Sequence, residues 1–202
     1  MNMIKIYLVL TMGIMALSAA DLTKYGDIIG RNGLTTAYSN KDDTYVSNEP
    51  HFITLNSTAY CSGMKWQCVE YARRWLMENR NIIFGDVQYA TDIWQLSGAV
   101  NLSDKARPLT AVRYTNGTAT EMPKTADLLI YDTSYAPITG HVSVIVEVGP
   151  DSINVAEQNY SSYKWAAYDY SQKLGITCMQ KEQGEVRYSI ADTGVIGWIR
   201  FI

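Results

Sequence analysis

The segment that decides the fold reads Lys65-Trp66-Gln67-Cys68-Val69-Glu70-Tyr71-Ala72-Arg73-Arg74. Within and just beyond it, apolar side chains recur at spacings of three, four and seven residues, as on the buried face of a helix. This spacing predicts a helix over residues 66–79. We expect Glu70 and Arg74, four residues apart, to form an ion pair on the outer side of that helix. The apolar positions are Cys68, Val69, Ala72, Trp75 and Leu76.

Cys68 lies where the predicted helix begins. A thiol there faces the positive end of the helix dipole and the free N–H groups of the first turn, which lower its pKa and make it a better nucleophile. The same N–H groups suit the oxyanion of a tetrahedral intermediate. A buried cysteine that only fills the core side of the helix is an equally compatible reading.

The remainder of the chain predicts strands and loops around this helix. Residues 21–60 are expected to be an irregular lead-in with a few short strands, such as Asp27 to Gly30. A second helix is expected around Asp92 to Ala99, and residues 101–124 are expected to be loop-like because of Pro108, Asn116-Gly117 and Pro123. Strands are expected at 127–131, 141–148, 153–157, 186–190 and 197–201. A helical region followed by consecutive strands indicates an α+β fold with a mostly antiparallel sheet.

The predicted hairpin around Gly149 brings a histidine and a carboxylate together. His141 to Val148 alternates, with valines on one face and His141 on the other. A turn centred on Gly149 places His141 opposite Glu157 on the same face, and directly opposed β-carbons are about 4.5–5.5 Å apart. A carboxylate at that distance can orient an imidazole. The pattern therefore proposes a Cys68–His141–Glu157 triad, with Glu157 as a solvated strand end as the alternative.

Three further residues are weaker site candidates. Gln67 precedes the nucleophile and its amide can donate to an oxyanion. Asn159 follows Glu157 by two residues and returns to the same side of the strand. Arg73 can bind a substrate carboxylate bidentately. A surface arginine or a turn asparagine would be the commoner explanation of such residues.

Four segments together resemble the CHAP family, the cysteine, histidine-dependent amidohydrolases and peptidases. The closest likeness is to the amidase domain of glutathionylspermidine synthetase/amidase. The likeness lies in the quoted nucleophile segment and in three later segments, Thr139-Gly140-His141-Val142, Ala156-Glu157-Gln158-Asn159 and Ile196-Gly197-Trp198. It implies a papain-like fold and hydrolysis of a linear amide, such as the glutathione–spermidine bond, through an acyl-thioester.

The resemblance also implies a role for each candidate residue. Cys68 would be the nucleophile, His141 the base and Glu157 the orienting acid. Gln67 would support the oxyanion, and Arg73 and Asn159 would lie along the substrate groove. No synthetase half is expected, since the sequence stops at Ile202.

The N-terminus predicts export. Lys5 is followed by an almost wholly apolar run from Ile6 to Leu17 and then by Ser18-Ala19-Ala20, a pattern typical of a signal peptide. We expect cleavage after Ala20, one amidase domain over residues 21–202, and a secreted, periplasmic or lumenal protein without stable membrane association. An uncleaved anchor is the alternative.

Three cysteines are an odd number for an exported chain. The economical arrangement pairs Cys61 with Cys178 in a disulfide and leaves Cys68 free. The alternative is that Cys61, seven residues before Cys68, serves it as a redox partner.

The overall composition limits the partners. With 202 residues and a net charge of −3, the chain predicts one domain and gives no electrostatic reason to bind nucleic acid. Scattered cysteines and two histidines indicate no metal site, and the chemistry needs no cofactor. We expect a monomer acting on a small peptide, a polyamine–peptide conjugate or a cell-wall peptide. A peptidoglycan hydrolase and a non-catalytic interaction protein on the same fold remain alternatives.

Overall fold

A computed structural model describes residues 22–42, 44–161, 163–180 and 184–202. The predicted signal peptide, residues 1–20, lies outside these ranges. In chain order the elements are β1 (Ile28–Asn32), β2 (Thr35–Tyr38), β3 (Pro50–Leu55), β4 (Thr58–Met64), α1 (Cys68–Arg80), β5 (Ile82–Phe84), the 3-10 helix η1 (Ala90–Gln95), β6 (Gly98–Asn101), β7 (Pro108–Thr115), β8 (Leu128–Tyr131), β9 (His141–Val148), β10 (Ser152–Ala156), β11 (Gln172–Gln180), β12 (Val186–Ala191) and β13 (Val195–Phe201).

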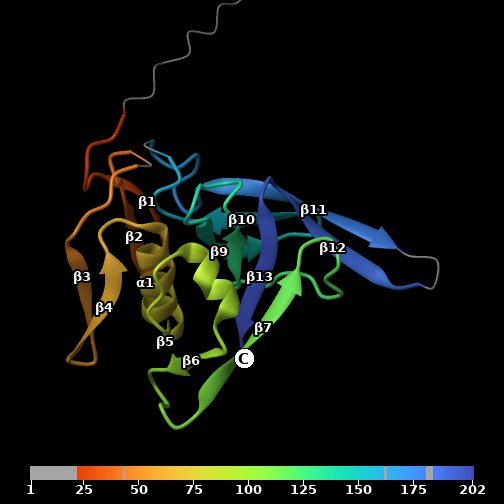
Figure 1. The fold of residues 1–202 in the computed structure, drawn as a ribbon, viewed down its shortest axis with the longest axis horizontal. Helices are drawn as coiled ribbons and strands as arrows, with labels where there is room; N and C mark the ends of the chain where they lie inside the picture. The colour runs from red at the N-terminus through yellow and green to blue at the C-terminus, as the bar shows by residue number, and fades with distance from the viewer. Residues whose placement is uncertain (1–21, 43, 162, 181–183) are drawn as a thin grey trace, which may run out of the picture.

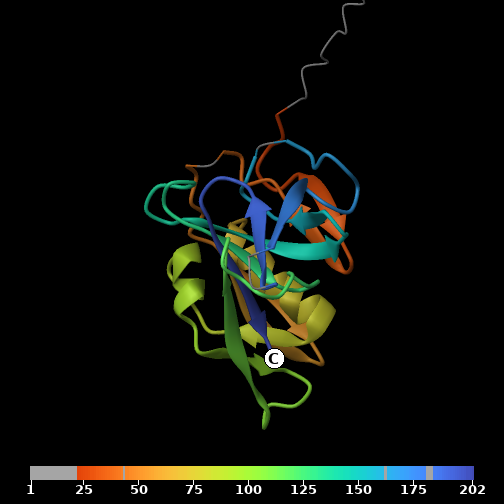
Figure 2. The ribbon, with the colours of Figure 1, turned by 90° about the vertical axis from the view of Figure 1, so that its right-hand side faces the viewer.

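One long antiparallel sheet organises the molecule. Its nine strands run in the order β12-β11-β10-β9-β8-β13-β7-β6-β5, and the hairpins β1-β2 and β3-β4 form separate two-stranded sheets. Figure 1 shows α1 between the β3-β4 hairpin and the middle of the large sheet, and it contacts both β4 and β9. Figure 2 shows the same ribbon turned by 90° about the vertical axis. A helix packed on antiparallel sheets is the α+β, papain-like arrangement that the sequence predicts.

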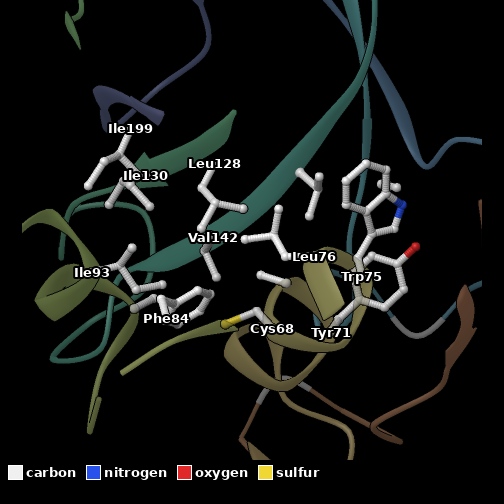
Figure 3. Packing of buried hydrophobic residues seen from close by; sticks show 14 of the residues in the cluster. Cys68, Tyr71, Trp75, Leu76, Phe84, Ile93, Leu128, Ile130, Val142 and Ile199 are labelled. Atoms are coloured by element: carbon white, nitrogen blue, oxygen red, sulfur yellow. The ribbon is translucent and has the colours of Figure 1, made fainter. Parts of the chain in front are cut away.

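Both faces of the central strands are buried. Leu128 and Ile130 of β8 pack with Val142 against α1, whereas Leu129 and Tyr131 belong to a second cluster on the opposite face. Figure 3 shows the first cluster, with Cys68 among its labelled side chains. Because alternate residues of β8 fill two cores, all four of its residues are buried, and this strand reads as a continuous apolar run.

The principal helix forms close to its predicted position. It begins at Cys68 after Gln67, whose backbone is extended, and ends at Arg80, which is followed by Asn81 in the left-handed conformation. The Glu70–Arg74 pair is present, with Arg74 Nε 2.6 Å from Glu70 Oε1. Its expected location was wrong, because both side chains are buried between the helix and the lead-in strands.

Two expectations for the middle of the chain were wrong in part. The helix expected at 92–99 is present only as the 3-10 helix η1, which ends at Gln95, and residues 98 and 99 belong to β6. The loop expected at 101–124 contains β7, which pairs with β13 from Thr115–Gly197 to Ala111–Phe201. Pro108 is the first residue of β7, and Asn116-Gly117 follows it, so these turn residues mark its ends. The lead-in holds four strands, the first of them at 28–32.

The described residues contain no helix long and apolar enough to span a bilayer.

We expect the stability of the protein to depend strongly on Leu128, a fully buried residue of the central strand β8. Leu128→Ala should lower the free energy of unfolding by about 2–5 kcal/mol, because it removes apolar contacts and leaves a cavity. The matched control, Leu34→Ala, changes a leucine that is mostly exposed and should stay within about 0.5 kcal/mol of the parent. Urea unfolding measures both. Equal losses in the two variants would contradict the described core.

Candidate active site

Cys68 is the first residue of α1 and its side chain is only 9% exposed. Burial raises the pKa of its thiol, but the charge of His141 and a hydrogen bond with that ring outweigh burial and lower the pKa below its ordinary value. The backbone N–H groups of Val142 and Val69 also donate to the sulfur and lower its pKa. The sulfur is therefore surrounded by groups that favour the thiolate.

His141 begins β9 and lies between the thiol and a carboxylate. Its Nε2 is 2.8 Å from Glu157 Oε2, which leaves Nδ1 for the sulfur of Cys68. Burial lowers the pKa of the imidazole, but the charge and hydrogen bond of Cys68, together with Glu157, raise it to about 10. The two shifts have one cause, since a thiolate and an imidazolium in contact each stabilise the charge of the other.

The strand register differs from the predicted one, yet the residues still meet. Ala156 pairs with Val144, and the register shifts between Asn154 and Val155. Glu157 therefore lies diagonally across from His141, two residues from the predicted position. Because side chains alternate with a period of two, a shift of two residues keeps both on the same face.

The carboxylate of Glu157 is also fixed by Gln172, the first residue of β11, and by Ser171 just before it, which no pattern in the sequence predicted. Its Oε1 accepts hydrogen bonds from Ser171 Oγ at 2.6 Å and Gln172 Nε2 at 2.9 Å. Its Oε2 is thus left to face His141, and Glu157 is buried. Pairing of Val155 with Gln172 brings β11 here, and no local sequence signal announces a pairing of strands joined by so long a loop.

The residue before His141 packs closely. Gly140 has a positive φ, and a Cβ there would lie 2.4 Å from the carbonyl oxygen of Tyr131 and 2.6 Å from Thr91. It therefore permits close packing of β8 and η1 around the start of β9. Gly140 is itself buried, so it opens no access to His141 on this side.

Three tyrosines surround His141. The ring centroids of Tyr131, Tyr135 and Tyr160 lie 5.6, 5.5 and 6.2 Å from that of the imidazole. Tyr135 and Tyr160 also stack on each other, at 6.1 Å. Tyr131 ends β8, Tyr135 follows that strand and Tyr160 follows β10, so no short motif predicted them. His141 is only 2% exposed, and these rings contribute to its burial.

Gln67 and Asn159 lie beside the site in a closed ring of three amides that includes Asn40. Gln67 Nε2 donates to Asn40 Oδ1 at 3.1 Å, Asn40 Nδ2 to Asn159 Oδ1 at 3.0 Å, and Asn159 Nδ2 to Gln67 Oε1 at 3.1 Å. Gln67 Nε2 also donates to the carbonyl of Tyr45 at 3.2 Å. Both amide protons of Gln67 are engaged, so it would contact an oxyanion only by exchanging a partner.

Arg73 contacts Asp86 and Phe84. Its Nη1 lies 2.9 Å from the exposed carboxylate of Asp86, and its guanidinium lies over the ring of Phe84. Phe84 belongs to the same cluster as Cys68, and Figure 3 shows the sulfur directed toward it. Arg73 Nε is buried without a hydrogen-bond partner among the described residues.

The expected disulfide is not formed. Cys61 and Cys178 are both free and exposed, and Cys68 is free and buried. Cys61 lies in β4 and Cys178 in β11, which belong to different sheets and lie toward opposite sides of Figure 1. Across the described ranges, no three His, Cys, Asp or Glu side chains gather closely enough to hold a metal ion.

The fold and this site together define a papain-like protein, with a cysteine at a helix N-terminus facing a histidine on an antiparallel sheet. The sequence model of the CHAP domain matches residues 59–159, a range that includes Cys68, His141 and Glu157. This protein belongs to the CHAP domain family, and hence to a family of amidases and peptidases.

Several characterised proteins resemble the chain. Trypanothione synthetase of Crithidia fasciculata is 40% identical over 156 residues, which cover 74% of this chain and 22% of that protein. Bifunctional glutathionylspermidine synthetase/amidase of Escherichia coli (strain K12) is 31% identical over 167 residues, 80% of this chain and 26% of that protein. Glutathionylspermidine synthase of Crithidia fasciculata is 30% identical over 172 residues, 75% of this chain and 24% of that protein. The chain thus spans about a quarter of the length of these relatives.

The paired pKa shifts predict how the reactivity of Cys68 depends on pH. In a protein carrying Cys61→Ser and Cys178→Ser, alkylation by iodoacetamide should reach half its maximum rate well below pH ~8.5, the midpoint for an ordinary thiol. A lowered pKa means that the thiolate persists to lower pH. Adding His141→Gln should move the midpoint upward, because burial then acts on the thiol without a compensating charge. An unchanged midpoint would contradict the ion pair.

Proposed function

We propose that this protein is a cysteine amidase that hydrolyses a linear amide bond, with Cys68 as nucleophile, His141 as general acid and base, and Glu157 as the acid that orients His141. The observation that supports this most strongly is the arrangement around His141. One ring nitrogen is held by a buried carboxylate and the other is left to the sulfur at the helix N-terminus. That arrangement can activate a thiol and then protonate a leaving amine.

The reaction would proceed in two steps. The Cys68 thiolate attacks the amide carbonyl, and the imidazolium of His141 gives its proton to the leaving amine, which leaves an acyl-thioester. Neutral His141 then removes a proton from water, and the resulting hydroxide adds to the acyl carbon, which releases the carboxylic acid and restores the Cys68 thiolate beside the imidazolium. Glu157 holds the ring so that Nδ1 stays directed at the reacting atoms.

The first turn of α1 would hold the oxyanion. The N–H of Cys68 lies at the first helical position, where backbone donors lack an intrahelical acceptor. Gln67 would add a second donor if its amide leaves Asn40 or Tyr45 when substrate binds. Asn159, bonded to Gln67, would then border the same side of the groove, and Arg73 would exchange Asp86 for a substrate carboxylate.

The substrate we favour is an amide that joins a peptide carboxyl to an amine, of the kind named by the relatives. One of them is a glutathionylspermidine synthetase/amidase, and another is a trypanothione synthetase. The range matched by the CHAP domain model, residues 59–159, contains the complete Cys68–His141–Glu157 arrangement, which needs no nucleotide to cleave an amide.

A cell-wall peptide is the second candidate substrate. The N-terminal segment is typical of an export signal, and we propose that the protein acts outside the cytosol, in a secreted, periplasmic or lumenal location. An exported hydrolase would meet peptidoglycan cross-bridges and stem peptides there. This candidate predicts the same three catalytic residues and differs only in what occupies the groove.

Substitution of the nucleophile tests the proposed mechanism. The purified protein and its Cys68→Ala variant would be offered glutathione–polyamine conjugates and cell-wall muropeptides, with released amines measured. Cys68→Ala should lower the rate on the active substrate by about a thousandfold or more, because no other group can form the thioester. Cys178→Ala, which removes an exposed thiol in β11, should retain full activity. Equal turnover by the Cys68→Ala variant and the parent would contradict the mechanism, and inactivity of the parent on every substrate would favour a non-catalytic interaction protein.

A further inference from the structure

A buried carboxylate that the reaction does not use lies two residues after the nucleophile. Glu70 is fully buried in the first turn of α1. Its Oε1 accepts from Ser62 Oγ at 2.9 Å and Arg74 Nε at 2.6 Å, and lies 2.8 Å from His51 Nδ1. Its Oε2 accepts from Gln158 Nε2 at 2.9 Å and Arg74 Nη2 at 3.2 Å. Five hydrogen bonds therefore converge on one carboxylate.

The carboxylate of Glu70 is charged in the fold. Burial raises its pKa, but the hydrogen bond with His51 and the charge and hydrogen bonds of Arg74 outweigh burial and lower the pKa to about 2. A buried charge is costly unless it is fully paired, and removing one partner leaves that cost uncompensated. The partners of Glu70 are thus fixed in place more firmly than neutral side chains would be.

Gln158 connects the carboxylate of Glu70 to the segment at the end of β10 that carries Glu157. It is fully buried and lies between Glu157 and Asn159 in the chain. Its Nε2 donates to Glu70 Oε2 and to the carbonyl of Gln67, the residue before the nucleophile, at 3.3 Å. Its Oε1 accepts from the N–H of Tyr38 at 2.8 Å and from Arg74 Nη2 at 3.3 Å. All four hydrogen-bonding positions of this amide are occupied.

We infer that Glu70 and Gln158 are positioning residues, which lock the segment bearing Glu157 against the first turn of α1 and so set the distance from Cys68 to His141 and Glu157. The inference rests on the proposed function and deepens it. Cys68 and Glu157 are far apart in the chain and lie on different layers, so the triad needs a link between helix and strand. Gln158 provides that link, because it donates to the carbonyl of Gln67, the residue before Cys68, and directly follows Glu157 in the chain.

The β1-β2 and β3-β4 hairpins both contact the end of this link that contains Glu70 and Arg74. Arg74 donates to the carbonyl of Thr36 in β2 at 2.7 Å, and His51 and Ser62 belong to the β3-β4 hairpin. The hairpins that precede the helix therefore hold the charged end of the link. This accounts for the position of the β3-β4 hairpin against α1 on the side away from the large sheet in Figure 1.

The test measures the reactivity of Cys68, which requires no substrate. Iodoacetamide alkylation would be followed against pH in proteins whose other two cysteines are serine, comparing the parent with Glu70→Gln and Gln158→Met. Gln158→Met keeps the Glu70–Arg74 ion pair and a similar side-chain volume, so it should fold even where Glu70→Gln does not. We expect both variants to raise the midpoint pH and to slow alkylation at pH 7 about tenfold, since small displacements of reacting groups have large effects on rate.

A second buried ion pair provides the matched control. Asp127 is buried and pairs with Arg200 at 2.8 Å on the large sheet, with no bond to the triad. Asp127→Asn should lower the melting temperature while leaving the alkylation profile of Cys68 unchanged. Gln158→Glu, which keeps the acceptor for Tyr38 but places a second carboxylate beside Glu70, should behave like Gln158→Met.

The outcomes separate this inference from the proposed function. A parent protein whose Cys68 alkylates only at high pH would overturn the ion pair on which both proposals rest. A parent with a low midpoint, together with Gln158 variants that share its profile, would overturn the positioning role and leave the proposed amidase intact. Profiles that shift as far in Asp127→Asn as in Gln158→Met would show a general effect of lost stability and would also overturn the positioning role.

Discussion

The ion pair between Cys68 and His141 is the interaction on which the site depends. A thiol buried to this extent would stay protonated if burial acted alone, because charged groups are costly in an apolar environment. The imidazole of His141, with the N–H groups of Val69 and Val142, reverses that effect. The same imidazole would be neutral in the core without the sulfur and the carboxylate of Glu157. Cys68 and His141 therefore each hold a charge only because the other is in place.

The fold brings together segments that are distant in the chain, and so places Cys68, His141 and Glu157 in contact. The helix contributes its N-terminus, β9 contributes its first residue, and the end of β10 contributes the carboxylate. The antiparallel order β11-β10-β9-β8 fixes the last two relative to each other and brings Ser171 and Gln172 behind Glu157. The hairpins before the helix fix the first, through the buried charge of Glu70. The site is thus assembled from both sides of the helix–sheet interface.

Much of this could be predicted from the sequence where the signal was local. The period of apolar residues located α1, and strict alternation located β9. The same-face relation of His141 and Glu157 survived an error of two residues because the strand period is two. The rest depended on long-range pairing. The partners of β7, the amide ring around Gln67, and the tyrosines around His141 come from segments that meet only in three dimensions. The burial of Glu70 could not be predicted because a charged residue at i,i+4 from an arginine is typical of an exposed helix face.

Ring nitrogen chemical shifts of His141 test the central claim most directly. The chain has two histidines, so the titration of His141 can be assigned against a His51→Gln variant in ¹⁵N-labelled protein. The account predicts an imidazolium at pH 7, with both ring nitrogens protonated, that loses its proton only near pH 10 and becomes neutral at pH 7 when Cys68 is replaced by serine. A neutral imidazole at pH 7 in the parent protein, with one nitrogen unprotonated, would contradict it.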